Sequence, residues 1–300
     1  MSSLELLPTM TKNSDQDLDK TVYHQVIGCS ILLVILFGLG HNIFLSSGDP
    51  FSGPKPSTHP FTAMGFLVLA GSIFFRPQWA HSVWLKGILC WLMILLAGLR
   101  IAEALFPDHI TFYEDSWLSQ SLEAVGMYGR FSIETAIFLI CCFGFELSQE
   151  RHTIVRLLLV SVCLAILSFG FAETVYSFFL WGNELSMITQ FGMWLVSLDL
   201  LVQMRNQPPF RIVLQPGRSS FYLQFTALAL YLLPMIIGIV VLNKLQVSPS
   251  EQAPFELIFA GASCVLLGAV LLLGTYLDRK KPPENAWSST ASRRDRHQDD

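Results

Sequence analysis

Long apolar stretches separated by short polar segments dominate the pattern of this 300-residue chain. A helix needs about 20 consecutive apolar residues to cross the roughly 30 Å hydrocarbon core of a bilayer. Eight stretches approach or exceed that length, and none alternates between apolar and polar residues as barrel strands do. They cover 24–46, 60–76, 83–106, 130–149, 154–180, 185–204, 220–244 and 255–277. The pattern therefore predicts an all-α polytopic membrane bundle of eight transmembrane helices.

A short stretch containing threonine recurs where three of the apolar runs begin. Its copies are His59-Pro-Phe-Thr-Ala63, Ser132-Ile-Glu-Thr-Ala136 and Ser186-Met-Ile-Thr-Gln190, and a weaker copy, Ala253-Pro-Phe-Glu256, precedes the last run. Recurrence at helix starts is typical of a chain built from one duplicated unit. We therefore expect four repeated hairpins.

Composition and charge place the chain in a lipid bilayer and give it an orientation. Hydrophobic residues make up 52% and charged residues 14%, against about 25% charged in a typical soluble domain. If both termini are cytoplasmic, only four of the 19 lysines and arginines lie outside: Lys55, Arg100, Arg130 and Lys244. Cytoplasmic loops are normally the positively charged ones. The sequence thus predicts a multi-pass protein of the bacterial inner membrane that binds no nucleic acid.

The chain divides into a large membrane domain and two polar tails. We expect a cytoplasmic N-terminal tail over 1–23, a transmembrane domain over 24–278 with an outer cap at 107–129, and a disordered cytoplasmic tail over 279–300. Metal-ligand spacings of histidine and cysteine are missing, as are the motifs of common catalytic sites. The sequence therefore predicts no cofactor, no metal and no enzymatic activity.

Polar side chains near the outer ends of several helices form the candidate ligand-binding layer. Its members are Arg100, Glu103, Arg130, Glu134, Glu173, Thr62, Thr135, Thr189 and His41. In one interpretation the threonines stabilise helix starts and the acids lie at the membrane interface. In the other, the charged groups point into the bundle, pair with one another and line a cavity. Arg100 and Glu103 have the spacing of neighbours on one helical face.

Three further polar positions have several interpretations. His41 is a candidate haem ligand, a pH sensor or a hydrogen-bonding partner of a neighbouring helix. Glu146 and Asp199 fall near the cytoplasmic ends of their helices, where we expect them to pair with Arg151 and Arg205 as orientation anchors, the alternative being a proton path.

Two stretches of the chain resemble the multi-helix integral-membrane sensory regions of bacterial histidine kinases and diguanylate cyclases. They are Leu99-Arg-Ile-Ala-Glu-Ala-Leu-Phe106 and Gly129-Arg-Phe-Ser-Ile-Glu-Thr-Ala136, and 182–189 and 203–208 are similar to a further hairpin of that type. The resemblance implies a membrane region that senses a stimulus and passes it to a cytoplasmic output domain. The chain departs from that family after Tyr276, where we expect no output domain.

Three functions are consistent with these features. The leading one is a non-enzymatic membrane sensor or regulatory subunit that acts through a membrane or cytoplasmic protein partner. The second is a structural or assembly subunit of a larger inner-membrane complex, in which helix faces bind partner helices or the tails of lipids or pigments. The third is a small-solute transporter, a class in which internal repeats are common.

Overall fold

Helices make up all the regular secondary structure in the described part of the chain, so the predicted all-α class is confirmed there. The computed structural model describes residues 22–39, 58–76, 83–113, 115–124, 131–176, 186–208, 210–211 and 218–245, with parts of 258–276. The two predicted tails, 1–23 and 279–300, lie outside the described residues except for 22–23.

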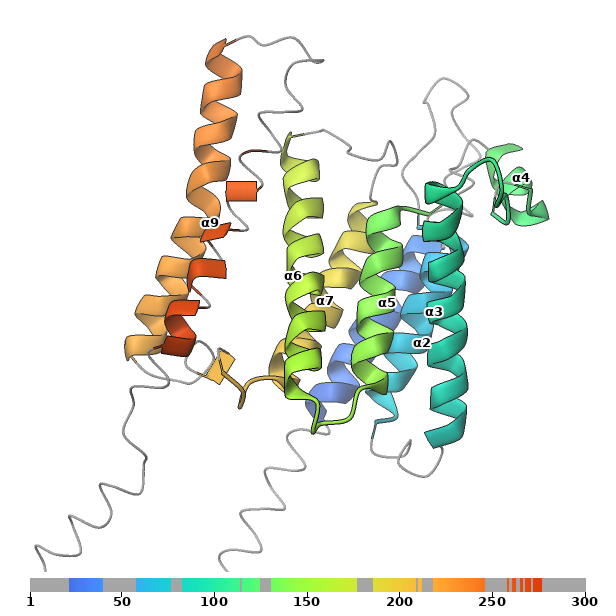
Figure 1. Cartoon of the computed structure of the whole chain (residues 1–300), viewed down its shortest axis with the longest axis horizontal. Coiled ribbons are helices and arrows are strands. Elements are labelled where there is room, and N and C mark those ends of the chain that lie inside the picture. The colour runs from blue at the N-terminus through green and yellow to red at the C-terminus, as the bar shows by residue number, and fades with distance from the viewer. Residues whose placement is uncertain are drawn as a thin grey trace, which may run out of the picture.

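The observed helices follow the apolar runs closely. The first helix covers Val22–Leu39, and the elements after it are α2 (Pro60–Phe74), α3 (Val83–Leu105), α4 (Trp117–Ala124), α5 (Ile133–Leu147), α6 (Thr153–Tyr176), α7 (Met187–Gln203) and α9 (Arg218–Leu245) (Figure 1). The described residues between 258 and 276 are helical as well. Helix α4 lies inside the segment predicted to form an outer cap.

Four of these helices contain a stretch long and apolar enough to cross a membrane. These candidate spans are Val22–Leu39, Val83–Leu105, Thr153–Phe171 and Phe221–Val241, whereas Pro60–Phe74 and Ile188–Gln203 are apolar but shorter. At 1.5 Å per residue, a 15-residue helix such as α2 is only about 22 Å long. The chain is therefore a multi-pass membrane protein with four candidate spans. The count of eight spans and the four repeated hairpins stay predictions.

The short helices occupy the interior, and longer helices surround them. Helix α5 buries nine of its 15 residues, whereas α3 buries five of its 23. Helix α5 lies between α3 and α6 and also packs against α2 (Figure 1). The outer side of α3 exposes large apolar side chains such as Ile88, Trp91 and Leu95. An exposed apolar face of this kind is what a helix presents to lipid.

Two glycines let the first helix approach its neighbours. A Cβ atom added at Gly28 would lie 3.0 Å from the Cβ of Phe74 and 3.1 Å from the carbonyl oxygen of Ala70, both on α2. A Cβ atom at Gly38 would lie 2.8 Å from the hydroxyl of Thr58 and 2.9 Å from Ile188 on α7. Small residues allow such close contacts between membrane helices. The first helix is thus held against α2 near one end and against α7 near the other.

The recurring threonine stretch has a local role as a helix start. The residue three positions before each threonine is the N-cap of its helix: His59 for α2, Ser132 for α5 and Ser186 for α7. The Ser132 hydroxyl accepts a hydrogen bond from the Thr135 N–H at 3.2 Å, and Ser186 accepts one from the Thr189 N–H at 3.1 Å. Such caps satisfy backbone donors that have no partner within the helix. Capping thus gives each described copy a local role, while the duplicated hairpin stays a prediction. The fourth copy, Ala253-Pro-Phe-Glu256, lies outside the described residues.

Helix α9 lies at the edge of the bundle, beside α6 (Figure 1). The Tyr231 hydroxyl donates to the Ser168 carbonyl oxygen at 3.3 Å, and its ring lies 6.4 Å from the ring of Phe171. Leu223 on α9 packs against Val270 in a small cluster separate from the main core. The buried polar side chains at the two ends of the bundle are therefore positioned by the helices other than α9.

We predict that Gly28→Val destabilises the protein and that Gly71→Val does not. A side chain at Gly28 meets the α2 backbone, and overpacking of this kind costs about 1–3 kcal/mol. A Cβ atom at Gly71 has no neighbour within 4 Å. Thermal unfolding of both variants in lipid nanodiscs measures the difference. Equal melting temperatures for the two variants would contradict the close approach of the first helix to α2.

Candidate functional site

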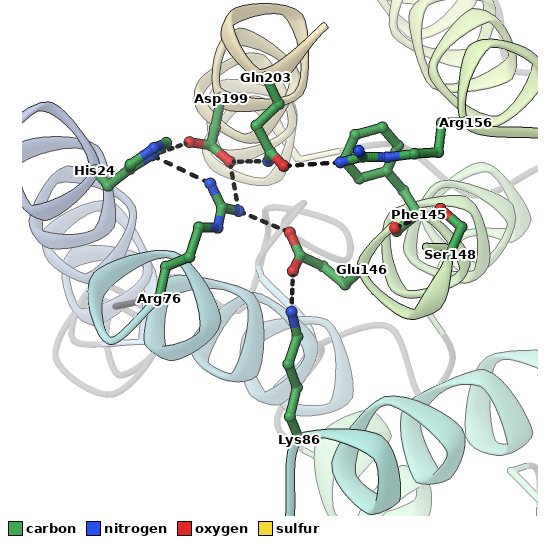
Figure 2. Close-up of polar contacts among 9 residues, drawn as sticks. All are labelled: His24, Arg76, Lys86, Phe145, Glu146, Ser148, Arg156, Asp199 and Gln203. Carbon is green, nitrogen blue, oxygen red and sulfur yellow. Dashed lines mark hydrogen bonds and ion pairs between the residues drawn. The ribbon is translucent and has the colours of Figure 1, made fainter. Parts of the chain in front are cut away.

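A connected group of polar side chains joins six helices at one end of the bundle. We call this the charged end: it is where the first helix, α3 and α6 begin and where α2, α5 and α7 end. Figure 2 shows the side chains pointing toward one another from separate helices. The charged network consists of His24, Arg76, Lys86, Glu146, Arg156, Asp199 and Gln203.

Asp199 on α7 is the most deeply buried member, with a fully buried side chain. Its Oδ1 lies 2.8 Å from Nδ1 of His24 on the first helix. Its Oδ2 accepts hydrogen bonds from Arg76 Nη2 at 3.1 Å and from Gln203 Nε2 at 2.8 Å. Both carboxylate oxygens are therefore engaged. A buried carboxylate is stable only when it is paired in this way.

Arg76, just beyond the end of α2, joins the two carboxylates of the network. Its Nη2 donates to Glu146 Oε1 at 2.8 Å as well as to Asp199. The other Glu146 oxygen, Oε2, accepts from the ammonium group of Lys86 on α3. Burial alone would lower the pKa of Arg76, but the negative charges of Glu146 and Asp199 raise it above its usual value. The guanidinium is thus firmly held in its charged form.

A neutral amide extends the network to α6. Gln203 Oε1 accepts a hydrogen bond from Arg156 Nη2 at 3.1 Å, while the guanidinium carbon lies 4.1 Å from the centre of the Phe145 ring. A cation placed over an aromatic face is attracted to it. Arg156 therefore contacts α7 through Gln203 and α5 through Phe145.

The threonine end, where α2, α5 and α7 begin, holds a second group of buried polar residues. Arg100 and Glu103, near the end of α3, are 3% and 1% exposed. Arg100 Nε donates to the carbonyl oxygen of Phe131 at 2.8 Å. The N–H of Tyr113 donates to Glu103 Oε2 at 3.3 Å. Burial raises the pKa of the Tyr113 phenol, and the negative charge of Glu103 raises it further.

Glu134 differs from the other buried carboxylates because neither of its oxygens hydrogen-bonds to a described residue. The residue is 3% exposed and lies in the first turn of α5. Burial disfavours its charged form most strongly, against the smaller opposing effects of the Ser132 hydroxyl and the Arg100 guanidinium and of the helix N-terminus. A buried carboxylate without hydrogen bonds is still costly. Both Glu134 oxygens therefore retain their capacity to accept a hydrogen bond.

The predicted site residues fall into three groups in the structure. Arg100, Glu103 and Glu134 are buried at the threonine end, and Arg100 bonds to the chain just before α5. The threonines Thr62, Thr135 and Thr189 are buried at the third positions of α2, α5 and α7. The remaining three cannot be placed: Arg130 and His41 lie outside the described residues, as does the side chain of Glu173 on α6.

The predicted partners of the acids at the charged end are wrong. Glu146 pairs with Arg76 and Lys86 instead of Arg151, and Asp199 pairs with Arg76 and His24 instead of Arg205. Both predicted pairings joined residues that are close in the sequence, but helix packing brings cations from other helices closer to the two carboxylates. The signal for this network that the sequence did contain was a set of polar residues within about one turn of several helix ends.

The described residues contain no group of three or more histidine, cysteine or acidic side chains arranged to hold a metal ion. An apolar groove between the first helix and α2 is lined by Cys29, Leu32, Gly71 and Phe75, among others. Binding of a lipid or pigment tail at helix faces stays a prediction.

Comparison with known proteins identifies no family for this chain. No family model matches it, and no curated protein and no solved structure matches it. What the fold and the sites define is a class: a multi-pass helical membrane protein with a buried charged network at one end and a buried polar group at the other.

We predict that Asp199→Asn lowers the free energy of unfolding by about 3–5 kcal/mol, the usual cost of breaking a buried ion pair. The amide group can replace only one of the two oxygens that now accept hydrogen bonds. Asp108→Asn, at an exposed position, is the matched control. Thermal unfolding in nanodiscs measures both variants, and equal stabilities would contradict the pairing described for Asp199.

Proposed function

We propose that this chain is a non-enzymatic membrane sensor or regulatory subunit that acts through partner proteins. The observation that carries the proposal is the buried Glu134 carboxylate, which has no hydrogen-bond partner among the described residues. A group in this situation gains most by taking up a proton or by meeting a donor from a ligand. Its surroundings therefore favour a site whose occupancy depends on conditions, which is the first requirement of a sensor.

The second requirement is a path to the other end of the molecule. Helix α5 carries Glu134 in its first turn, at the threonine end, and Glu146 in its last, at the charged end. Helix α3 runs the opposite way, with Lys86 in its first turn and Arg100 nearer its other end. Lys86 and Glu146 are bonded to each other within the charged network. A displacement of α5 against α3 at the threonine end is thus expected to strain a contact at the charged end. Coupling between two distant sites requires a structural element that has two arrangements, and both sites must influence which arrangement is populated.

The orientation we propose places the charged end in the cytoplasm of a bacterium, with the threonine end on the outer side of the inner membrane. The described cations Arg76, Lys86, Arg151, Arg156 and Arg205 lie at or near the charged end. Positive residues in short loops favour the cytoplasmic side. The charged end is then the surface available to a cytoplasmic partner.

Glu134→Gln tests the sensor function. The amide keeps the shape of the side chain but removes the charge, so we expect the response to be locked in one state. Quantitative crosslinking in native membranes would show a change in partner association of about fivefold or more, the lower end of typical allosteric coupling. Glu123→Gln, at an exposed position on α4, is the matched control and should leave association unchanged.

Identical partner association in both variants, with the fold intact, would overturn the sensor proposal. Loss of a complex only when an exposed apolar residue such as Trp91 is replaced by alanine would instead favour a structural subunit. Solute flux in proteoliposomes would favour a transporter.

Topology is tested independently by single added cysteines. We expect a cysteine at Glu150, an exposed position near the charged end, to be protected from a membrane-impermeant maleimide in intact spheroplasts. A cysteine at the exposed Asp108 should be labelled. Labelling is compared with the parent chain, whose own Cys29 is exposed. The reverse pattern would contradict the proposed orientation.

A further inference from the structure

The imidazole of His24 faces two groups that make opposite demands on one nitrogen atom. Its Nδ1 lies 2.8 Å from Asp199 Oδ1 and 3.2 Å from Arg76 Nη1 (Figure 2). A carboxylate oxygen only accepts hydrogen bonds, so the first contact requires a proton on Nδ1. A guanidinium only donates, so the second contact requires a bare Nδ1. Both contacts cannot be hydrogen bonds at the same time.

The shorter distance decides which of the two demands is met. Without a proton between Nδ1 and Oδ1, two lone pairs would face each other at 2.8 Å, which is repulsive. With the proton there, the Arg76 guanidinium meets an N–H group at 3.2 Å and gains nothing from it. Arg76 keeps its place because its other nitrogen is bonded to Glu146 and Asp199.

We propose that His24 is the proton-binding site of the charged network, holding one proton on Nδ1 toward Asp199 and taking up a second on Nε2 as the pH falls. Uptake of the second proton places a positive charge between Asp199 and Arg76. It strengthens the contact with Asp199 and repels Arg76. The network then shifts toward a His24–Asp199 pair and an Arg76–Glu146 pair.

Charged and titratable groups from several helices surround this site. Tyr23 lies next to His24 on the first helix with its ring edge-on to the imidazole. Asp199 and Arg205 approach from the α7 side, Arg205 through its effect on Tyr23. Arg76 approaches from the end of α2. Glu146 on α5 and Lys86 on α3 act through Arg76 and not directly.

The position of His24 allows this exchange to take place. Its side chain is 16% exposed, whereas that of Asp199 is fully buried. Proton uptake at His24 therefore alters how the first helix, α2 and α7 are joined. This inference does not depend on the sensor proposal, because it concerns only the charged end.

The tautomer of His24 is the direct test. Nitrogen NMR of ¹⁵N-histidine-labelled protein in nanodiscs, with the His24 signal assigned by its loss in His24→Gln, should show the Nδ1-protonated neutral form at pH 8. It should show the doubly protonated form at low pH. A neutral ring with its proton on Nε2 and a bare Nδ1 at pH 8 would overturn the proposal.

A double-mutant cycle tests the consequence for Arg76. We expect the loss of melting temperature caused by Arg76→Gln to be smaller at pH 5.5 than at pH 8, by about 2–4 °C. In a His24→Gln background that loss should be equal at both pH values, because a glutamine amide satisfies Asp199 and Arg76 together without titrating. His152→Gln, next to Arg151, is the matched control background and should preserve the difference. A pH-independent loss in the parent chain would overturn the proposal.

Discussion

The shared Arg76 guanidinium is the interaction on which the described structure depends most. It lies between two buried carboxylates, Glu146 on α5 and Asp199 on α7, that would be unstable in an apolar bundle without a cation. Arg76 itself lies just beyond the end of α2. Lys86 and His24 bond to the same carboxylates and connect α3 and the first helix, and Gln203 connects α6 through Arg156. Moving any one of these helix ends leaves a buried charge partly uncompensated. The network therefore sets the relative positions of the helices at that end.

This constraint also explains the unequal helix lengths. The inner helices α2, α5 and α7 are bounded by capping side chains at one end and by the charged network at the other, which leaves 15 to 17 residues between them. The first helix, α3 and α6 face outward and follow the thickness of an apolar layer instead. The described bundle thus has two polar layers with apolar helices between them, an arrangement compatible with the proposed transmission of a signal from one membrane surface to the other.

Helix positions were predictable from the sequence, and polar contacts were only partly so. Apolar runs locate helices because lipid and core both require apolar side chains, and the observed ends of α2, α3 and α7 lie within two residues of the predicted ones. The depth of a polar residue also follows from its place in a run, so the sequence pointed to Arg100 and Glu103 as a layer. The facing direction does not follow, because it depends on which helices are neighbours. His24 and Arg76 were therefore missed, and Glu146 and Asp199 were given the wrong partners.

One arginine, Arg76, joins α5 and α7 through two buried carboxylates. Solid-state NMR in lipid bilayers can correlate the guanidinium nitrogens of Arg76 with the carboxyl carbons of nearby acids. We expect through-space cross-peaks from Arg76 to both Glu146 and Asp199. A guanidinium that correlates with neither, or with water alone, would contradict this arrangement.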